Sequence, residues 1–183
     1  MGTTMNLTNN PFTARYQNGA VLIAGLILLL IITLIGISSM QSVALDEKMT
    51  ANMRDATLAF QATESALSDG EEWLKNQLTP PDGVSSCDTN PCHVWDLNRL
   101  GNVSINAQSW WTSVGRPFSG TLNGVQTQPH YVIEYYGFVP YELSPDARSK
   151  GLGYYYYKVT AHGTGALDTS KVQLESIYTT QFN

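Results

Sequence analysis

Charged residues are scarce in this chain. Asp, Glu, Lys and Arg make up 14% of its 183 residues, and the formal net charge is −5. Lys and Arg are scattered singly, so the basic stripe of a nucleic-acid-binding protein is missing. The sequence also lacks the common hydrolase, zinc-protease, phosphate-loop and dinucleotide motifs. Asp82, Asp88 and Asp96 lack the regular spacing of an EF-hand calcium site. We therefore expect no enzyme, no nucleic-acid partner and no cofactor.

Cysteine and histidine are also rare, with two and three copies. Cys87 and Cys92 lie close together, and a disulfide between them would close a tight loop worth about 2 kcal/mol. Zinc binding with His93 as a third ligand is the alternative. Zinc sites usually add a second ligand group from elsewhere, and His130 and His162 are distant in sequence and isolated. We predict the disulfide and no metal site.

One long stretch has no charged residue: residues 20–45 contain no Asp, Glu, Lys or Arg. About 20 apolar residues in a helix cross the hydrocarbon core of a bilayer, so this stretch predicts a membrane-spanning helix. Arg15 precedes it and Asp46 follows it, which places the C-terminal part outside the cytoplasm. A removable secretory signal is the alternative, since Ser42 and Ala44 form a small-x-small site. Such signals have shorter apolar stretches, of about 7–15 residues.

The helical pattern continues beyond the apolar stretch. Alternate steps of four and three residues place one set of side chains on a single helix face. Its members, besides Thr63 and Gly70, are Met49, Met53, Ala56, Phe60, Leu67 and Leu74. We predict one helix over 20–76, ended by Pro80 and Pro81, whose second half packs this face against the rest of the fold.

The C-terminal third has the composition of β-strands. Residues 130–139, 153–162 and 171–180 are rich in Tyr, Val, Ile and Thr. Alternation in the last segment predicts an antiparallel sheet with one buried face, and it also sends neighbouring tyrosines of the run 154–157 to opposite faces. Residues 84–128 are loop-rich, with short strands possible near 103–110. The predicted class is α+β, a long N-terminal helix packed against a C-terminal antiparallel sheet.

Several motifs cluster within residues 17–72. They are Gly19-Ala20-Val21-Leu22-Ile23, Thr33-Leu34-Ile35-Gly36-Ile37, Leu45-Asp46-Glu47-Lys48-Met49, Asn52-Met53-Arg54-Asp55 and Leu58-Ala59-Phe60-Gln61-Ala62. Together they resemble the PilX-type minor pilins of type IV pili, and residues 157–165 resemble the last hairpin of that family. The resemblance implies the type IV pilin fold. It divides the chain into a leader (1–19), a membrane and filament-core half of the helix (20–45), and a periplasmic head (46–183).

The resemblance also implies processing. Prepilin peptidase would cut after Gly19, and the new N-terminus at Ala20 would be methylated. Most pilins have Glu at the fifth mature position, where this chain has Ala24. That Glu is expected to pair with the N-terminus of a neighbouring subunit, so its absence suits a subunit at the pilus tip. The alternative is that Ala24 is one more lipid-facing residue.

By the same resemblance, the chain would be a minor pilin that primes assembly and caps the pilus, supporting twitching motility and adhesion. Its expected partners are other minor pilins, the major pilin, prepilin peptidase, the inner-membrane assembly machinery and a large tip adhesin. It would reside in the inner membrane with a periplasmic head, then at the tip of the extracellular pilus. The alternatives are a tip pseudopilin of type II secretion and a single-span sensor or binding domain.

Overall fold

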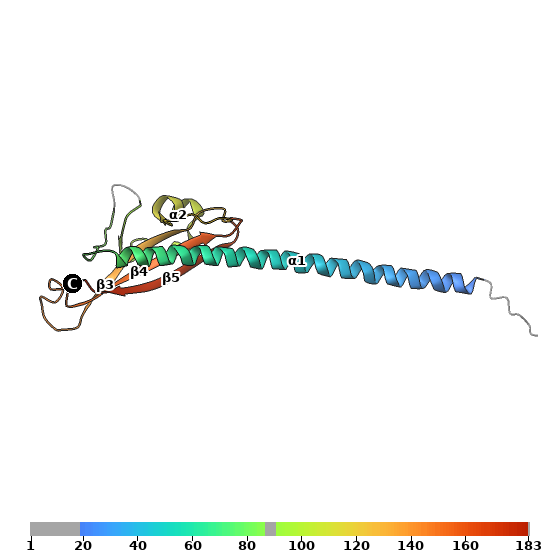
Figure 1. Ribbon diagram of the computed structural model, residues 1–183, viewed down its shortest axis with the longest axis horizontal. Coiled ribbons are helices and arrows are strands. Elements are labelled where there is room, and N and C mark those ends of the chain that lie inside the picture. Colours follow the sequence, from blue (N-terminus) through green and yellow to red (C-terminus); the bar gives the residue numbers. More distant parts are fainter. Residues whose placement is uncertain (1–18, 87–90, 183) are drawn as a thin grey trace, which may run out of the picture. The chain divides into compact units, whose positions relative to one another are not determined.

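A computed structural model describes residues 19–86 and 91–182 of the chain. The chain divides into two units, one ending at Lys48 and one beginning at Met49. Helix α1 (Ala20–Lys75) supplies all of the secondary structure described in the first unit and the first element of the second. The second unit, the head, adds two short helical segments and five strands (Figure 1).

The bounds of α1 agree with the predicted helix within one residue. The Gly19 carbonyl accepts the first helical hydrogen bond from the N–H of Ile23, at 3.2 Å. At the other end, the N–H groups of Asn76 and Gln77 close the last turn before the chain reaches Pro80. Because proline has no N–H and hinders the preceding turn, the helix does not continue through this segment.

Three long strands form the body of the sheet. Strands β3 (His130–Pro140), β4 (Gly153–Thr164) and β5 (Lys171–Thr180) pair antiparallel, which confirms the three predicted segments. Two short strands pair with β3: β1 (Trp95–Asp96) runs parallel to it, and β2 (Arg116–Pro117) runs antiparallel. The register of β3 shifts between Tyr135 and Gly137.

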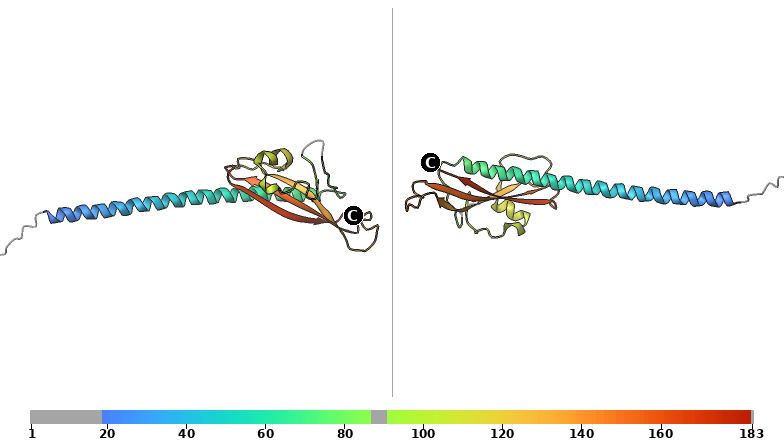
Figure 2. Two further views of the ribbon diagram at one scale, coloured as in Figure 1. Left: turned by 180° about the vertical axis from the view of Figure 1, so that it is seen from behind. Right: turned by 90° about the horizontal axis from the view of Figure 1, so that it is seen from below.

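The two faces of the sheet are covered differently (Figure 2). The C-terminal part of α1 covers the inner face, over a core that includes Leu74, Ile133 and Tyr157. The outer face is covered at one end by α2 (Gln108–Val114), which buries Trp111 beside Val132. Alternate tyrosines of β4 do face opposite sides: Tyr155 and Tyr157 are buried in the inner core, while Tyr154 is exposed.

The suggestion of short strands near residues 103–110 was wrong. This segment forms a 3-10 helix, η1 (Val103–Ile105), followed by α2. Asn102 caps η1 by accepting a hydrogen bond from the Ser104 N–H at 3.1 Å, which is a typical role of asparagine at a helix start. Val103 of this segment is buried within a helical turn, since tertiary packing overrides intrinsic preference.

Candidate functional site

The predicted processing point lies where α1 begins. Gly19 is exposed and has φ +81°, a conformation that glycine adopts without a steric penalty, and Ala20 is the first residue of the helix. The Gly19–Ala20 peptide bond is therefore exposed at a helix start. Ala24 lies one turn further on and is also exposed. Cleavage, methylation and the role of Ala24 remain predictions.

The apolar half of α1 has no partner among the described residues of its own unit. Its large hydrophobic side chains between Val21 and Leu45 are 49–76% exposed. Within the described residues, α1 is the one helix long and apolar enough to cross a membrane. Exposed apolar surface of this extent marks a membrane or protein contact, so this half of α1 supports membrane anchoring.

The second half of α1 packs against the sheet mainly through small side chains. The predicted stripe was wrong for Met49, Met53, Ala56 and Phe60, all of which are exposed. Leu67 is partly buried and Leu74 is fully buried, as predicted. The observed stripe consists of residues that are mostly small, namely Ala59, Ala62, Thr63, Ala66, Gly70 and Leu74. Thr63, Gly70 and Leu74 belong to both the predicted and the observed stripe. The sheet supplies the bulk at this contact, so hydrophobic size does not identify the other buried positions.

Two glycines show how closely helix and sheet approach. A Cβ on Gly70 of α1 would lie 2.8 Å from Val159 Cγ1 and 2.9 Å from Tyr131 Cδ2. A Cβ on Gly163 of β4 would lie 2.7 Å from Thr63 Oγ1. The Thr63 hydroxyl is positioned at this contact, where it donates to the Ala59 carbonyl at 2.7 Å. Side chains larger than hydrogen do not fit at either glycine without displacement.

Asp55 joins α1 to the turn between β4 and β5. Its carboxylate accepts a hydrogen bond from the Ala166 N–H, and the Ser170 side chain also donates to it. These bonds, the Ser170 contribution being the largest, lower the pKa of Asp55 below its ordinary value. Asp55 belongs to one of the motifs noted in the sequence, but no local pattern indicates this contact.

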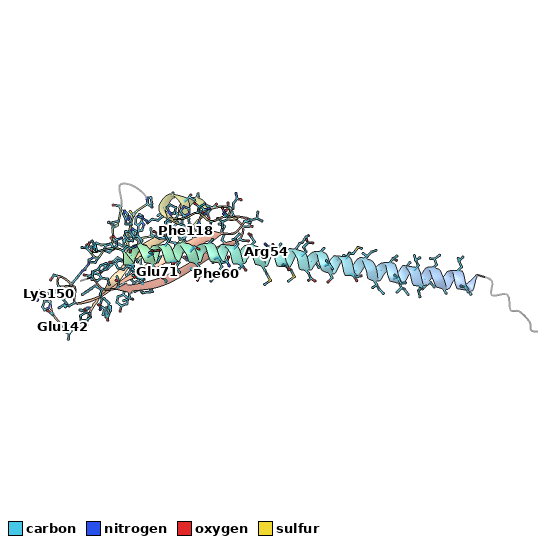
Figure 3. The ribbon with its side chains drawn as sticks, in the orientation of Figure 1. Arg54, Phe60, Glu71, Phe118, Glu142 and Lys150 are labelled. Atoms are coloured by element: carbon cyan, nitrogen blue, oxygen red, sulfur yellow. The ribbon has the colours of Figure 1, made fainter. Side chains whose placement is uncertain are left out.

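Two further carboxylates of α1 contact the head. Asp69 accepts hydrogen bonds from the backbone N–H of Ser119 at 2.8 Å and from its hydroxyl at 2.7 Å. Glu71 accepts one from the hydroxyl of Ser176 on β5 at 2.5 Å, and Figure 3 shows it on the helix. Bonds to a charged acceptor are stronger than neutral ones, so α1 is linked to three separate segments of the head.

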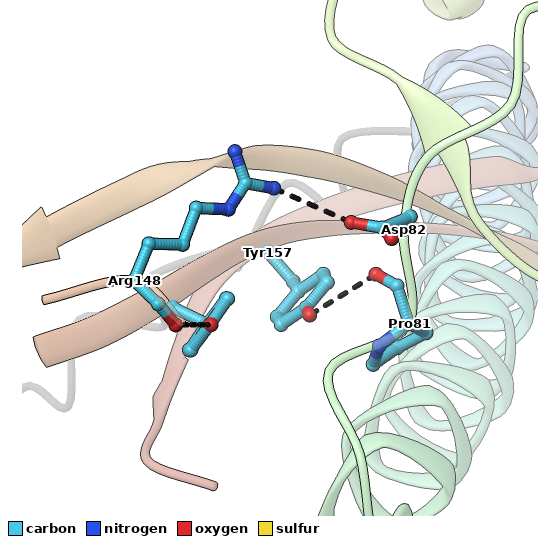
Figure 4. Close-up of polar contacts among 5 residues, drawn as sticks. Pro81, Asp82, Arg148 and Tyr157 are labelled. Atoms are coloured by element: carbon cyan, nitrogen blue, oxygen red, sulfur yellow. Dashed lines mark hydrogen bonds and ion pairs between the residues drawn. The ribbon is translucent and has the colours of Figure 1, made fainter. Parts of the chain in front are cut away.

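The end of the head opposite the β4–β5 turn is closed by polar contacts (Figure 4). The Tyr157 hydroxyl donates to the Pro81 carbonyl at 3.1 Å. Arg148, in the loop between β3 and β4, pairs with Asp82 at 3.3 Å. Glu142 and Lys150 belong to the same loop (Figure 3). The Arg148–Asp82 pair is largely exposed, so it orients the loop more than it stabilises the fold.

The predicted disulfide is not tested, because Cys87 lies outside the described residues. Cys92 is buried, with 6% of its surface exposed. His93, considered as a metal ligand, instead stacks on Trp73 of α1, with ring centroids 5.2 Å apart, and its Nδ1 contacts Arg116. Burial and the Arg116 charge lower the pKa of His93. The described residues contain no cluster of three metal-ligating side chains.

The other two histidines are neighbours, contrary to the interpretation that they are isolated. His130 and His162 lie directly opposite each other on β3 and β4, and both are buried. The His162 ring stacks on Trp111, with centroids 5.0 Å apart, and its Nε2 contacts Gln108 Oε1 at 2.7 Å. Burial lowers the pKa of His130, and it lowers the pKa of His162 to about 4. This cluster holds α2 on the outer face.

A buried ion pair lies further along the same face. Glu134 on β3 is 1% exposed and faces Lys158 on β4, whose side chain is 18% exposed. The carboxylate oxygens of Glu134 have no hydrogen bond from another described group. The geometry of this pair provides no nucleophile–base arrangement, and we assign it a structural role.

Comparison with protein families accounts for nearly the whole chain. The PilX N-terminal family model matches residues 18–68. The model of the C-terminal region of the type IV pilus assembly protein PilX matches residues 48–180. The comparison with curated proteins and the comparison with solved structures each found no match.

Proposed function

Because this chain belongs to the PilX family of type IV pilus assembly proteins, we propose that it is a minor pilin that primes assembly and lies at the pilus tip. The observation that carries the proposal is the combination of an exposed apolar helix with a head matched by the second family model. A subunit of this design has a structural role in the pilus, with no catalytic step.

Ala24 supports the tip position on energetic grounds. Removing one partner of a buried ion pair leaves an uncompensated charge that costs about 3–5 kcal/mol. A Glu at the fifth mature position would face this cost in a subunit that has no neighbour ahead of it. Alanine avoids the cost, while the amino group of Ala20 stays available to the Glu of the following subunit.

Processing at Gly19 and Ala20 is part of the proposal. Prepilin peptidase removes residues 1–19 on the cytoplasmic side, Ala20 is methylated, and residues 20–45 anchor the subunit in the inner membrane. The head then lies in the periplasm, where its partners are the other minor pilins, the major pilin, the assembly machinery and a tip adhesin. The oxidising periplasm favours the Cys87–Cys92 disulfide.

Mass spectrometry of the mature chain tests the processing. A methylated N-terminus at Ala20 is expected in cells with prepilin peptidase, and the intact chain is expected without it. An N-terminus at Met1 in both strains, or one near Ala44, would refute the proposal.

Deletion and one substitution test the role. Deletion should reduce surface pili and twitching while leaving major-pilin synthesis unchanged. If Ala24 reflects the tip position, Ala24→Glu should lower piliation, whereas the matched change Ala24→Ser should not. Equal piliation in the deletion strain and its parent would contradict priming, and normal piliation with Ala24→Glu would contradict the argument for the tip.

A further inference from the structure

Strand β5 (Lys171–Thr180) forms one edge of the sheet. It pairs with β4 on one side, and no strand in the described part of the chain pairs with its other side. The opposite side of the sheet is different, because β1 and β2 both pair with β3 there. We infer that the outer edge of β5 accepts an extended segment of another pilus subunit as an added strand. The identity of that partner rests on the proposed function.

The hydrogen-bond pattern shows which groups point outward. In an antiparallel pair, alternate residues exchange N–H···O bonds with the partner strand. The Gly165 N–H donates to the Ser170 carbonyl at 3.0 Å, which makes Val172 and then every second residue the inward-bonding ones. The N–H and C=O groups of the intervening residues therefore point away from β4. These are Lys171, Gln173, Glu175, Ile177 and Thr179.

The edge lacks most of the features that prevent strand addition. Proteins protect edges with prolines, bulges, lysines or very short strands. β5 is 10 residues long, contains no proline, and pairs with β4 without a register shift. Its charged residues are Lys171 at its start and Glu175 near its middle. Ile177, which lies toward the other end of the strand, is an apolar residue with 52% of its surface exposed.

The edge is also held in place before a partner arrives. Ser176 donates to Glu71 of α1, and the Thr63 hydroxyl approaches the Val172 carbonyl at 3.2 Å. Both contacts lie on the inner side of β5, so they fix the strand without using its outward groups. A strand already ordered by its own helix loses little entropy on binding another segment, which favours strand addition.

Charge argues for a different subunit over a second copy. If β5 paired antiparallel with β5 of another copy, the register that joins the most outward-pointing residues would place Glu175 opposite Glu175. Like charges directly opposite each other destabilise a strand pair. The fitting partner is an extended segment with a basic residue opposite Glu175 and an apolar residue opposite Ile177.

Photo-crosslinking in piliated cells tests the geometry. A benzophenone amino acid replaces Gln173 or Ile177 in the full-length chain, and the products are mapped by mass spectrometry. Paired strands have matched rises per residue, so the two positions should crosslink to one segment of one pilus subunit, about four residues apart. The control position is Leu97, which is exposed and lies in the loop after β1. It should not reach that segment.

A backbone variant separates main-chain from side-chain contacts. Ile177→Pro removes one outward N–H and keeps the bonds to β4, a placement that edge strands tolerate. Loss of one hydrogen bond, worth about 1 kcal/mol, lowers the crosslink yield from position 173 about fivefold. Ile177→Ala keeps the N–H and should retain most of the yield. The spacing of the crosslinks decides the question if the proline variant does not fold.

Evenly spaced crosslinks to a pilus subunit support the inference. Crosslinks between two copies, crosslinks scattered over several surfaces, or no crosslink in normally piliated cells would overturn it. None of these results alters the N-terminus of the mature chain or the deletion phenotype, so the proposed function is tested separately.

Discussion

Acid should loosen the outer layer of the head, because a buried histidine holds α2 on the sheet. His162 stacks on Trp111 and contacts Gln108, and it is 5% exposed. Burial is the main reason that its pKa falls from 6.5 to about 4. The charges of Lys171 and His130 lower it further, and Asp168 partly offsets them. The folded head therefore keeps this imidazole neutral at pH values where the unfolded chain is protonated.

The direction of the pH dependence follows from proton uptake. Between pH 6.5 and about 4 the unfolded state binds a proton at His162 and the folded state does not. Stability is therefore fully present above pH 6.5 and decreases as the pH falls through this range. At about 1.4 kcal/mol per pH unit, the total loss is about 3 kcal/mol. The lowered pKa of His130 acts in the same direction.

Urea denaturation of the full-length protein in detergent micelles measures the effect. All four tryptophans lie in the head, so fluorescence follows its unfolding independently of the apolar half of α1. Unfolding free energies at a series of pH values from 7 to 4 should fall steadily for the natural sequence. The variant His162→Gln lacks the titrating group, so its curve should be flatter even if it starts lower.

The matched control is His93→Gln, because His93 is exposed and its ring lies on the other side of the sheet, against Trp73. This change should alter the slope less than His162→Gln. Parallel curves for the natural sequence and His162→Gln between pH 6.5 and 4 would show that His162 does not control acid stability. A similar result for both variants would refute the assignment to this site.

Three other substitutions test individual contacts within the head. Gly70→Ala should destabilise the head by about 1–3 kcal/mol in urea denaturation, because side chains of the sheet fill the space that a Cβ would need. Gly36→Ala should not, because nothing lies near its Cβ position. Equal unfolding midpoints for the two variants would contradict this prediction. Lys158→Met should lower the free energy of unfolding by about 3 kcal/mol, because it leaves the buried Glu134 carboxylate without its partner. Adding Glu134→Leu to the same chain should recover most of this loss, and additive losses would refute the pairing. Asp55→Asn should speed amide exchange in the β4–β5 turn alone, and unchanged exchange there would argue against the contact.

The long elements of the fold could be predicted from local pattern. The helix predicted over residues 20–76 is observed as Ala20–Lys75, and the three predicted strands match β3, β4 and β5 closely. The reason is physical: an uncharged stretch followed by a helical period, and runs of β-branched and aromatic residues, each favour one conformation throughout. Short elements such as β1, η1 and α2 lack this redundancy.

Contacts between distant segments were harder to predict. The stripe predicted through Met53 and Phe60 follows hydrophobic size, but the sheet packs on Ala59, Ala62 and Ala66 because its own large side chains fill the interface. Size alone does not say which side of a contact supplies the bulk. The only sequence signal for the observed stripe is the recurrence of small residues at helical spacing.

The polar clusters also depend on strand register. His130 and His162 face each other, as do Glu134 and Lys158, only because β3 and β4 pair in one particular register. A change of one residue would send each side chain to the opposite face. Composition gives no access to that register, so the histidines looked isolated in the sequence.

The distribution of side-chain size around α1 bears on how a pilus subunit is built. Within the head, the small residues of α1 pack against the sheet, while Met49, Met53 and Phe60 are exposed. A helix that served only its own domain would turn large apolar residues inward, because burial of each contributes about 1.5–3 kcal/mol. Keeping them outward is favourable only if other chains cover them. The proposed place among pilus subunits supplies such chains, and it extends to the head the reasoning that applies to the exposed apolar half of the helix.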